Sequence, residues 1–420
     1  MNIYFSGLGG VGIGPLAEIA HDAGHTVMGS DLSENLVTHE LTEKGITVSI
    51  GQDGTFLRKS HEATPLDWFV YTAALPTDHP ELLAAKALGI RSGKRDEFLA
   101  EFIKAHNLQL IAISGTHGKT TTTGMTVWAF KQLGIPVSYS VGTTISFGSS
   151  GAFEAGSKYF VYECDEYDKN LLHFSPHLSL LTSIDYDHPD TYPTEEEYKA
   201  TFRQYVSQST QTIAWEKDIE YIEQPTNDSI WALGETETSQ VQITGEHNRR
   251  NATLVLKALE YLELGDAQKN LSILDSFPGT DRRFEKLADN LYTDYGHHPE
   301  EIAATLQLAR EISENIVLVY QPHQNWRQHF IRDQYTTQFE LAETIYWLPT
   351  YLTRENPDQV TLNPKELTVN VTNKSAIIYS ELNTKLWDKI QQHREAGKLV
   401  LCMGAGTIDS WVREQLRNNG

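Results

Sequence analysis

Cysteine is scarce in this sequence: the 420 residues include only two, Cys164 and Cys402. Two cysteines cannot form a disulfide framework or, by themselves, a structural zinc site. The first residues lack the basic stretch and the apolar run of a signal peptide, and no run of about 18 apolar residues occurs anywhere. We therefore expect a cytoplasmic protein with reduced thiols and no membrane-spanning segment.

Basic residues are also few relative to acidic ones. The 34 lysines and arginines are outnumbered by 56 aspartates and glutamates, which gives a formal net charge of −22. Such a charge argues against binding to nucleic acid or to an anionic membrane, because both need basic surface. It does not exclude a small anionic ligand, since a few local donors can outweigh the global field. We expect small-molecule partners and a monomer or weak dimer.

What the sequence does contain is an alternation of short apolar runs and amphipathic stretches. Its composition is that of an ordinary globular protein, with 40% hydrophobic and 21% charged residues, and its length suits two or three domains. The strand–helix alternation occurs three times, which predicts an α/β protein with parallel sheets. We place the domains at residues 1–106, 107–285 and 286–420. Strands are expected at 2–6, 26–29, 68–72, 108–114, 158–163, 178–184, 291–294, 316–320 and 399–403, helices at 15–23, 120–133, 195–206, 248–262 and 299–312, and short strands or loops at 215–245.

The strongest local signal is a glycine-rich loop between an expected strand and an expected helix. It reads Gly115-Thr116-His117-Gly118-Lys119-Thr120-Thr121. A glycine turn lets backbone N–H groups approach phosphate oxygens, and the following helix adds the positive end of its dipole. Lys119 is expected to reach the β- and γ-phosphates, and Thr120 to ligate Mg²⁺. The alternative is a strand–helix turn without a ligand, since Ile113 stands where the general pattern has glycine.

A second glycine turn follows the first expected strand. It reads Gly7-Leu8-Gly9-Gly10-Val11-Gly12, and Asp31 lies 19 residues beyond Gly12. This spacing is typical of a dinucleotide-binding fold, in which the turn holds a diphosphate and the carboxylate holds a ribose hydroxyl. Taken alone, it fits NAD, or a close helix–strand contact with no ligand. Two phosphate loops in one chain favour instead an ATP-driven enzyme that acts on a nucleotide-linked substrate.

Acidic side chains follow two of the expected central strands. Glu163, Asp165, Glu166 and Asp168 fall within six residues, and His188 comes soon after the next strand. Because the carboxyl ends of parallel strands meet at one edge of a sheet, both sets are expected to face the phosphate loop. Clustered carboxylates repel one another unless a cation is bound, and hard oxygens suit Mg²⁺. The alternatives are a solvated acidic loop and a structural histidine.

Polar groups gather at further places along the chain. The run His247–Asn251 opens an expected helix, where its amides could read an adenine edge or cap the helix. Arg283 suits the charge of a γ-phosphate, with an exposed arginine as the alternative. The segments Asp294–Pro299 and Gln321–His323 each follow a strand expected in the last domain. These positions are candidates for the second half of a site.

Taken in order, these motifs resemble those of the Mur ligase family. The resemblance covers nearly all 420 residues and rests on Gly7–Gly14, Gly29–Asp31, Gly115–Thr123, Glu163–Asp168, Asp187–His188, His247–Asn251, Gly279–Phe284, Asp294–Pro299 and Gln321–His323. It implies a Rossmann-like domain for a UDP moiety, a central P-loop ATPase domain with a mostly parallel sheet, and a Rossmann-like carboxy-terminal domain. It also implies an ATP-dependent, ADP-forming ligase of peptidoglycan precursor synthesis, which joins L-alanine to the lactyl carboxylate of UDP-N-acetylmuramate through an acyl phosphate.

The resemblance further implies roles for individual residues. ATP would be contacted by Gly115, Thr116, His117, Gly118, Lys119, Thr120, Thr121, Asn248, Asn251, Arg283 and Asp294, and Mg²⁺ by Thr120, Glu163 and His188. The UDP part would contact Gly7, Gly9, Gly10, Val11, Gly12, Asp31 and Thr72, and the amino-acid side would include His297, His323, Arg327 and Tyr351. The catalytic set would be Lys119, Glu163, His188, Arg283 and His323.

Three places on the amino-acid side depart from the family pattern. Gln324 stands where an arginine is expected, Asp409 stands where a glycine is expected, and residues 351–355 keep only the Tyr and Glu of a tyrosine-proline segment. A related ligase that attaches a whole murein tripeptide stays an alternative, because the pair Glu166-Tyr167 is a form also seen in that ligase. The altered amino-acid side keeps a non-catalytic sensor of nucleotide sugars as a further alternative. A nicotinamide dehydrogenase would leave Lys119 without a role. The candidate bases for the incoming amine are His323 and the pair Asp294 and His297.

Overall fold

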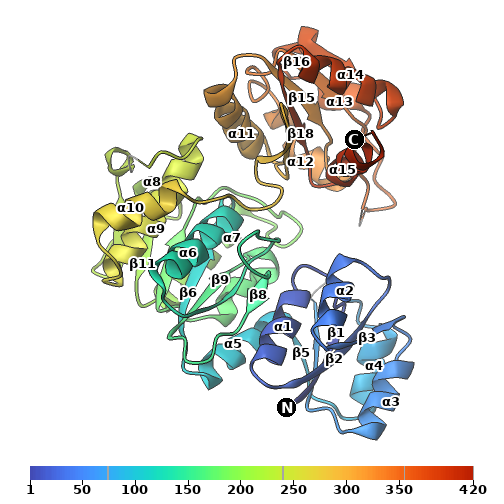
Figure 1. The fold of residues 1–420 in the computed structure, drawn as a ribbon, viewed down its shortest axis with the longest axis vertical. Helices are drawn as coiled ribbons and strands as arrows, with labels where there is room; N and C mark the ends of the chain where they lie inside the picture. Colours follow the sequence, from blue (N-terminus) through green and yellow to red (C-terminus); the bar gives the residue numbers. More distant parts are fainter. Residues whose placement is uncertain (73–74, 239–240, 354, 420) are drawn as a thin grey trace. The chain divides into compact units, whose positions relative to one another are not determined.

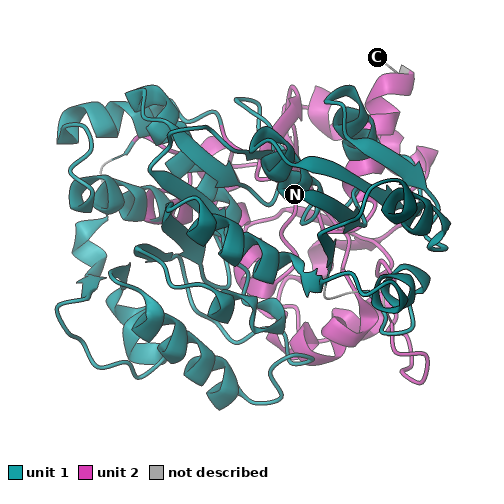
Figure 2. Cartoon of the chain, turned by 90° about the horizontal axis from the view of Figure 1, so that it is seen from below, with its two compact units in different colours: residues 1–241, 251–278 teal, residues 242–250, 279–420 magenta. Residues whose placement is uncertain are grey.

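A computed structural model describes residues 1–72, 75–238, 241–353 and 355–419. Its backbone contacts divide the chain into two compact units, which Figure 2 shows in teal and magenta. Unit 1 comprises residues 1–241 and 251–278, and unit 2 comprises residues 242–250 and 279–420. Three sheets, two in unit 1 and one in unit 2, organise the described residues. The expected α/β class with three domains is confirmed (Figure 1).

The first sheet has the strand order β3-β2-β1-β4-β5, and all its pairs are parallel. Side chains of β1 alternate between its two faces: Ile3 and Phe5 pack with helices α1 and α5, whereas Tyr4 packs with α3 and α4. This is the Rossmann-like arrangement that the first glycine turn predicts. The elements are β1 (Asn2–Ser6), α1 (Gly14–Asp22), β2 (Thr26–Asp31), α2 (Leu36–Glu43), β3 (Thr47–Ile50), α3 (Thr55–Ala63), β4 (Trp68–Tyr71), α4 (Pro80–Ala87), β5 (Ser92–Lys94) and α5 (Arg95–Ala105).

The second sheet has the order β12-β11-β10-β6-β9-β7-β8, parallel except that β8 runs antiparallel to β7. Strand β6 lies at its centre, so the loop that follows β6 leaves from the middle of the carboxyl edge. The elements are β6 (Gln109–Ser114), α6 (Lys119–Leu133), β7 (Val137–Ser140), β8 (Gly151–Ala152), β9 (Tyr159–Glu163), η1 (Tyr167–His173), β10 (Leu178–Leu181), α7 (Glu195–Gln208), β11 (Thr212–Trp215), α8 (Glu216–Tyr221), β12 (Ile230–Leu233), η2 (Glu235–Glu237), α9 (Glu246–Tyr261) and α10 (Ala267–Asp275).

Unit 2 contains the third sheet, with the order β13-β14-β18-β15-β16-β17. Only its β13–β14 pair is antiparallel among the described residues. One face packs against α11, and the other packs against α14 and α15. The elements are β13 (Glu285–Ala288), β14 (Leu291–Asp294), α11 (Pro299–Ile312), β15 (Ile316–Tyr320), α12 (Asn325–Ile331), η3 (Arg332–Gln334), β16 (Thr344–Trp347), α13 (Pro364–Leu367), η4 (Lys374–Ala376), β17 (Ile377–Tyr379), α14 (Thr384–Glu395), β18 (Leu399–Met403) and α15 (Ile408–Asn419).

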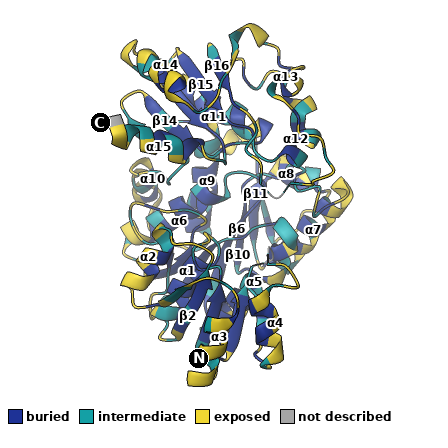
Figure 3. Ribbon diagram, turned by 90° about the vertical axis from the view of Figure 1, so that its right-hand side faces the viewer, coloured by how far each residue is buried: buried dark blue, intermediate teal, exposed yellow. Residues whose placement is uncertain are grey.

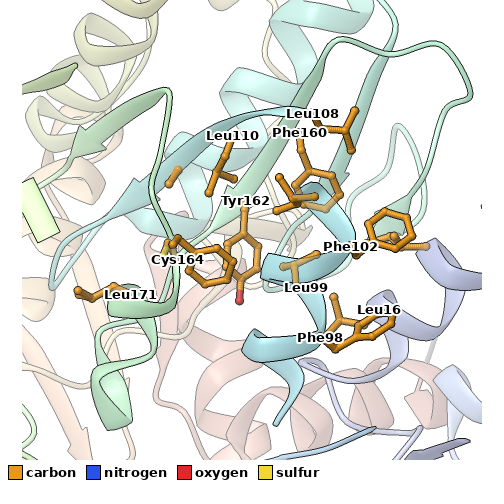
Figure 4. Close-up of a cluster of buried hydrophobic side chains, with 14 of the residues drawn as sticks. Leu16, Phe98, Leu99, Phe102, Leu108, Leu110, Phe160, Tyr162, Cys164 and Leu171 are labelled. Atoms are coloured by element: carbon orange, nitrogen blue, oxygen red, sulfur yellow. The ribbon is translucent and has the colours of Figure 1, made fainter. Parts of the chain in front are cut away.

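The first two sheets share one hydrophobic core, and helix α5 joins them. Figure 4 shows apolar side chains of α5 between those of α1 and those of β6 and β9; they include Leu16, Phe98, Leu99, Phe102, Leu110, Phe160 and Tyr162. All of these residues are at most 5% exposed. The polar contact between Tyr162 Oη and Asp96 Oδ1, 2.6 Å, lies in the same region. The two domains of unit 1 are therefore joined by a common interior.

Several boundaries differ from the sequence-based expectations. Strand β10 ends at Leu181 rather than at residue 184, because the next residues bond to the phosphate loop: Ser183 O accepts from Thr116 N at 2.7 Å. In the stretch 215–245, expected to form short strands or loops, helix α8 was missed. Helix α8 has only six residues and buries one apolar side chain, Ile219, so the sequence shows no helical periodicity there. Helix α9 begins at Glu246, so Asn248 is not its cap, as had been one alternative.

Burial follows the sheets. Figure 3 shows the strands largely in the dark blue of buried residues, while exposed residues lie on the outer helices and loops. The two cysteines are both free and both buried. Within the described part of the chain, no helix is long and apolar enough to cross a membrane.

Candidate active site

The phosphate loop between β6 and α6 needs glycine at two positions. Gly115 has φ +128°, and a Cβ there would lie 2.5 Å from the carbonyl oxygen of Ser183. Gly118 has φ +82°, and a Cβ there would lie 2.8 Å from Asn251 Oδ1 on helix α9. L-residues rarely adopt such backbone angles, and neither site has room for a side chain. Glycine at these two positions therefore allows the backbone conformation of the loop, and the side chain of Asn251 lies directly against Gly118.

We expect Gly115→Ala to destabilise the protein by at least about 2 kcal/mol, because backbone strain and overpacking add at this position. Gly134→Ala is the matched control, since Gly134 also has positive φ (+70°) but has nothing within 4 Å of the added Cβ. Gly134→Ala should lower the free energy of unfolding by about 1 kcal/mol. Urea denaturation of the two variants measures the difference. Equal losses of stability would contradict the close contact with Ser183.

Lys119, the first residue of α6, folds back over the loop. Its Nζ donates to the carbonyl oxygens of Gly115 at 2.6 Å and Thr116 at 3.1 Å, and to Glu166 Oε2 at 2.8 Å. Burial alone would lower the pKa of Lys119, but the negative charges of Glu166 and Asp165 outweigh it and raise the pKa above its ordinary value. The loop thus carries a permanent positive charge at its centre.

Thr120 and Glu163 form a pair of oxygen groups beside this lysine. Thr120 Oγ1 donates to Glu163 Oε1 at 2.8 Å, and Glu163 Oε2 accepts from the backbone N–H of Gly142 at 2.8 Å. A hydroxyl and a carboxylate are hard ligands of the kind that Mg²⁺ takes when it binds together with substrate phosphates. These two members of the expected metal set are therefore in place and chemically suited to it.

The acidic segment after β9 is not one metal cluster, and that interpretation of the clustered carboxylates was wrong. Glu166 pairs with Lys119, Asp165 Oδ2 lies 3.7 Å from Arg95 Nη2, and Asp168 Oδ2 lies 2.5 Å from Lys94 Nζ. Three cations of the protein therefore neutralise the mutual repulsion that seemed to call for a bound ion. In the described ranges, no group of three or more His, Cys, Asp and Glu side chains is arranged to hold a metal.

His188 lies next to the Lys119–Glu166 pair. Its Nε2 is 3.8 Å from Glu166 Oε1 and 3.7 Å from Asp187 Oδ2, and its ring stands edge-on to Tyr167 at 5.2 Å. Its backbone has φ +55°, an uncommon conformation for a residue with a side chain. The structure therefore brings His188 to the phosphate loop, through Glu166. Its role as a metal ligand stays a prediction.

Asp31 shapes the amino-terminal glycine turn. Its Oδ2 accepts from Gly9 N at 2.8 Å and its Oδ1 from Ser33 N at 3.2 Å. Gly7 N and Leu8 N both donate to the carbonyl oxygen of Ser30, at 2.8 and 3.0 Å. The carboxylate expected to hold a ribose hydroxyl therefore already supports the turn. Thr72 comes directly after β4, at the same edge of the sheet.

Glu81 is a buried carboxylate beneath this turn that sequence reasoning missed. It is 1% exposed and accepts hydrogen bonds from Tyr4, Ser6 and Ser30 at 2.6 to 2.8 Å. These donors come from the adjacent strands β1 and β2, so Glu81 fixes the strand ends from which the turn departs. Its only sequence signal is a Pro-Glu pair at the start of α4, which is typical of any helix start.

In unit 2, Asp294 holds the loop that carries Arg283. Its Oδ2 accepts from Phe284 N and its Oδ1 from Gly296 N, both at 2.7 Å. Burial raises the pKa of Asp294 to about 6, although Arg283 and the two N–H groups act in the opposite direction. Arg283 itself lies with its Cζ 5.1 Å from the centre of the Tyr295 ring. Asn248, also in unit 2, donates to the carbonyl oxygen of Thr244 at 3.0 Å.

The four residues expected on the amino-acid side come together within unit 2. The rings of His323 and Tyr351 are stacked, with their centroids 5.8 Å apart. The His297 ring stands edge-on to the His323 ring, with a centroid separation of 5.5 Å. Arg327 Nη1 lies 3.1 Å from His297 Nε2, while His297 Nδ1 lies 3.2 Å from the carbonyl oxygen of Tyr295. We assign the neutral tautomer with the proton on Nδ1, since Arg327 has only donors.

Gln324 and Asp409, which depart from the family pattern, have local structural roles. Gln324 N donates to the carbonyl oxygen of Tyr351, and Gln324 Nε2 to that of Thr353. Asp409 accepts from Thr293 Oγ1 at 3.1 Å and pairs with Arg413 at 3.1 Å. Asp409 therefore fastens helix α15 to strand β14. Sequence reasoning had no signal for Tyr351, Thr353 or Thr293 as partners, because each of them is distant in the chain, whereas Arg413 lies one turn along the same helix as Asp409.

Comparison with known proteins adds independent findings. Three family models match: Mur ligase family, catalytic domain, at residues 2–107; Mur ligase middle domain at residues 113–214; and Mur ligase, glutamate ligase domain, at residues 282–406. The UDP-N-acetylmuramate–L-alanine ligase of Thermosynechococcus vestitus is 31% identical, over 97% of this chain and 94% of that protein. The enzyme of the same name from Coxiella burnetii is 29% identical, over 100% of this chain and 98% of its own length.

Solved structures agree on the fold. The UDP-N-acetylmuramate-alanine ligase of Thermotoga maritima superposes with a TM-score of 0.77 at 24% identity, covering 100% of this chain and 99% of that one. A murein peptide ligase of Psychrobacter arcticus gives a TM-score of 0.66 at 21% identity, covering 99% and 98%. With the ordered motifs, the full-length relatives and the shared fold in agreement, the chain belongs to the Mur ligase family.

Proposed function

We propose that the chain is an ATP-dependent ligase that joins L-alanine to the lactyl carboxylate of UDP-N-acetylmuramate in peptidoglycan precursor synthesis. Membership of the Mur ligase family supports an ATP-dependent, amide-forming ligase, and the full-length relatives are named for L-alanine. One observation carries the proposal: unit 1 joins a lysine-centred phosphate loop and a second glycine turn through a common core. That combination suits ATP and a nucleotide-linked acid as co-substrates.

The chemistry has two steps. A carboxylate oxygen of the sugar attacks the γ-phosphorus of ATP, so that ADP leaves and an acyl phosphate forms. The amine nitrogen then attacks the acyl carbon, inorganic phosphate leaves, and the amine loses a proton. Phosphoryl transfer depends on positioning and on neutralisation of charge. We assign these tasks to the loop amides, Lys119 and Arg283, with Asn251 and Asn248 on the adenine side.

Thr120 and Glu163 would hold Mg²⁺, as their oxygen atoms suit that ion. When bound, the ion supplies neutralisation of the phosphate charge. His188, whose Nε2 lies 3.8 Å from Glu166 Oε1, stays our third candidate for this site. Asp31 and Thr72, together with Gly7, Gly9, Gly10, Val11 and Gly12, are assigned to the UDP part.

The amino acid is assigned to unit 2. His297 Nε2 already accepts from Arg327, and both oxygens of Asp294 already accept from backbone N–H groups. His297 therefore offers no open lone pair as a base in this arrangement, and Asp294 is engaged in holding its own loop. We therefore assign proton removal from the amine to His323, with Tyr351 stacked on its ring and Arg327 holding the neighbouring histidine.

A phosphate-release screen tests the proposal. The protein is supplied with MgATP, UDP-N-acetylmuramate and, in separate reactions, single amino acids or the murein tripeptide. We expect release only when both the sugar nucleotide and an amine are present, and the fastest release with L-alanine. A preference for the tripeptide would reassign the third substrate. Tight binding of the sugar nucleotide without ATP turnover would indicate a sensor and overturn the proposal.

The buried carboxyl of Asp294 should make stability depend on pH. An unfolded aspartate releases its proton near its ordinary pKa, about 4, whereas the folded group keeps its proton up to about pH 6. Between these values the folded state binds more protons, so the free energy of unfolding falls as the pH rises, by about 3 kcal/mol for this group.

Asp294→Asn removes this titration. The slope of the unfolding free energy between pH 4 and pH 6 should therefore be less negative in the variant than in the wild type. Urea denaturation across this range measures both slopes, and Asp289→Asn, at an exposed position near the end of β13, is the control. Parallel slopes for Asp294→Asn and the wild type would contradict the raised pKa.

A further inference from the structure

Arg95, the first residue of α5, places its guanidinium against the amino-terminal glycine turn. A Cβ on Gly12 would lie 2.1 Å from Arg95 Nη1, so the guanidinium occupies the space that the missing side chain leaves. The side chain of Arg95 is 22% exposed, so most of it is enclosed and a part of it is open to solvent. Sequence reasoning gave this arginine no role.

Two carboxylates fix the orientation of this guanidinium. Arg95 Nε donates to Asp96 Oδ2 at 2.9 Å, and Asp96 Oδ1 in turn accepts from Tyr162 Oη on strand β9. On the other side, Arg95 Nη2 lies 3.7 Å from Asp165 Oδ2. These contacts engage Nε and Nη2. Among the described residues, none provides an acceptor for Nη1, which is the nitrogen that faces Gly12.

The backbone of the turn offers matching donors. The N–H groups of Gly7, Leu8, Gly9 and Gly10 are used within the fold, bonding to Ser30 O, Asp31 Oδ2 and Gly7 O. In the part of the chain that the structure describes, the N–H groups of Val11 and Gly12 have no acceptor, and Val11 is 68% exposed. Two amides and a guanidinium N–H thus lie together at one turn, a set of donors that suits phosphate oxygens.

Arg95 also lies within a short chain of charges that leads to the phosphate loop. Asp165 contacts Arg95, and its negative charge acts on Lys119 as well. A purely structural ion pair would need Asp96 and Asp165 but would not need the guanidinium to be set into the turn at Gly12. The contact with Gly12 is what distinguishes a ligand-binding arginine from a simple link between two domains.

We propose that Arg95 is a specificity-determining residue of unit 1 that binds the diphosphate of the nucleotide sugar, together with the N–H groups of Val11 and Gly12. The assignment rests on the proposed function, because it takes a nucleoside diphosphate as the ligand of the turn. Asp96 and Asp165 are the positioning residues that aim the guanidinium. Through Asp165, the arginine joins the sugar-nucleotide site to the loop that carries Lys119.

The test compares the binding of UDP and of uridine to Arg95→Lys, Arg95→Met and the wild type. We expect the dissociation constant for UDP to rise at least about tenfold in both variants, because lysine lacks the second N–H arm of the guanidinium. Uridine has no phosphate, so its weak binding should change less than twofold. Calorimetry for UDP and ligand-observed NMR for uridine measure these constants. Arg58→Met, at an exposed position on α3, is the matched control and should bind both ligands normally.

Steady-state kinetics complete the test. The KM for UDP-N-acetylmuramate should rise at least tenfold in Arg95→Lys, while the KM for ATP stays within about twofold. Unchanged UDP binding in Arg95→Lys overturns the assignment, and so does an equal loss of UDP and uridine affinity, which would indicate a distorted turn. The thermal midpoint of each variant identifies a failure to fold. If the wild type binds UDP through Arg95 but releases no phosphate, the proposed function fails and the binding role stands.

Discussion

Replacing Lys119 with methionine should lower the rate of phosphate release about 1000-fold or more. Lys119 Nζ is the central positive charge of the phosphate loop, held by the carbonyl oxygens of Gly115 and Thr116. Methionine keeps the length and the apolar stem of the side chain but removes the charge that stabilises the transferring phosphoryl group. Loss of one such charge typically lowers the rate of phosphoryl transfer by roughly two to five orders of magnitude.

The substitution also leaves the buried carboxylate of Glu166 without its cation, which could destabilise the protein by itself. The double variant Lys119→Met with Glu166→Gln removes both charges and separates the two effects. We expect the double variant to recover thermal stability but not activity. Lys131→Met, on the same helix α6 but bonded to Tyr139 and Phe147, is the control and should keep near-normal activity. Activity in Lys119→Met above about a tenth of the wild-type rate would refute the assignment.

The second large effect is expected for Glu163→Gln, with a fall in phosphate release of about 100-fold or more. Glutamine keeps the shape and can still accept the hydrogen bond from Thr120, but it no longer presents a charged oxygen to a cation. The Mg²⁺ concentration needed for half of the maximal rate should rise correspondingly. A titration of the rate with MgCl₂ at fixed ATP measures both quantities.

Asp168→Asn provides the matched control for Glu163→Gln. Asp168 lies in the same acidic segment, but it pairs with Lys94 and is 38% exposed, so its charge should matter little to the reaction. We expect its rate and its Mg²⁺ requirement to stay within about threefold of the wild type. An equal effect of the two substitutions would show that the segment acts through its total charge and not through Glu163.

The phosphate loop was predictable because its signal is local. A buried strand, two glycines, a lysine and a threonine at fixed spacing define its geometry, and the structure reproduces that geometry around Gly115 and Lys119. The glycine turn before α1 was predictable for the same reason. In both cases the backbone supplies the binding groups, so neighbours in sequence are also neighbours in space.

The acidic segment after β9 was misread because the partners of its carboxylates are distant in sequence. Lys94, the last residue of β5, and Arg95, the first of α5, lie some 70 residues upstream of Asp168 and Asp165 and belong to another domain. Sequence reasoning saw several negative charges and inferred a cation, and it could not see that the protein itself supplies three. Glu81 escaped notice for a similar reason: its donors come from strands β1 and β2. Such pairings become visible only once the chain has folded.

The shared interior beneath α5 limits how this chain can be divided. Because Phe98 and Phe102 pack together with Phe160 and Tyr162, cutting the chain near residue 106 would expose a large apolar surface on each fragment. Neither fragment should be soluble alone, although sequence models separate them there. A chimera that takes its first 106 residues from a relative would have to inherit a matching set of aromatic contacts. Residues 1–106 are thus better regarded as one lobe of a larger folding module than as an exchangeable part.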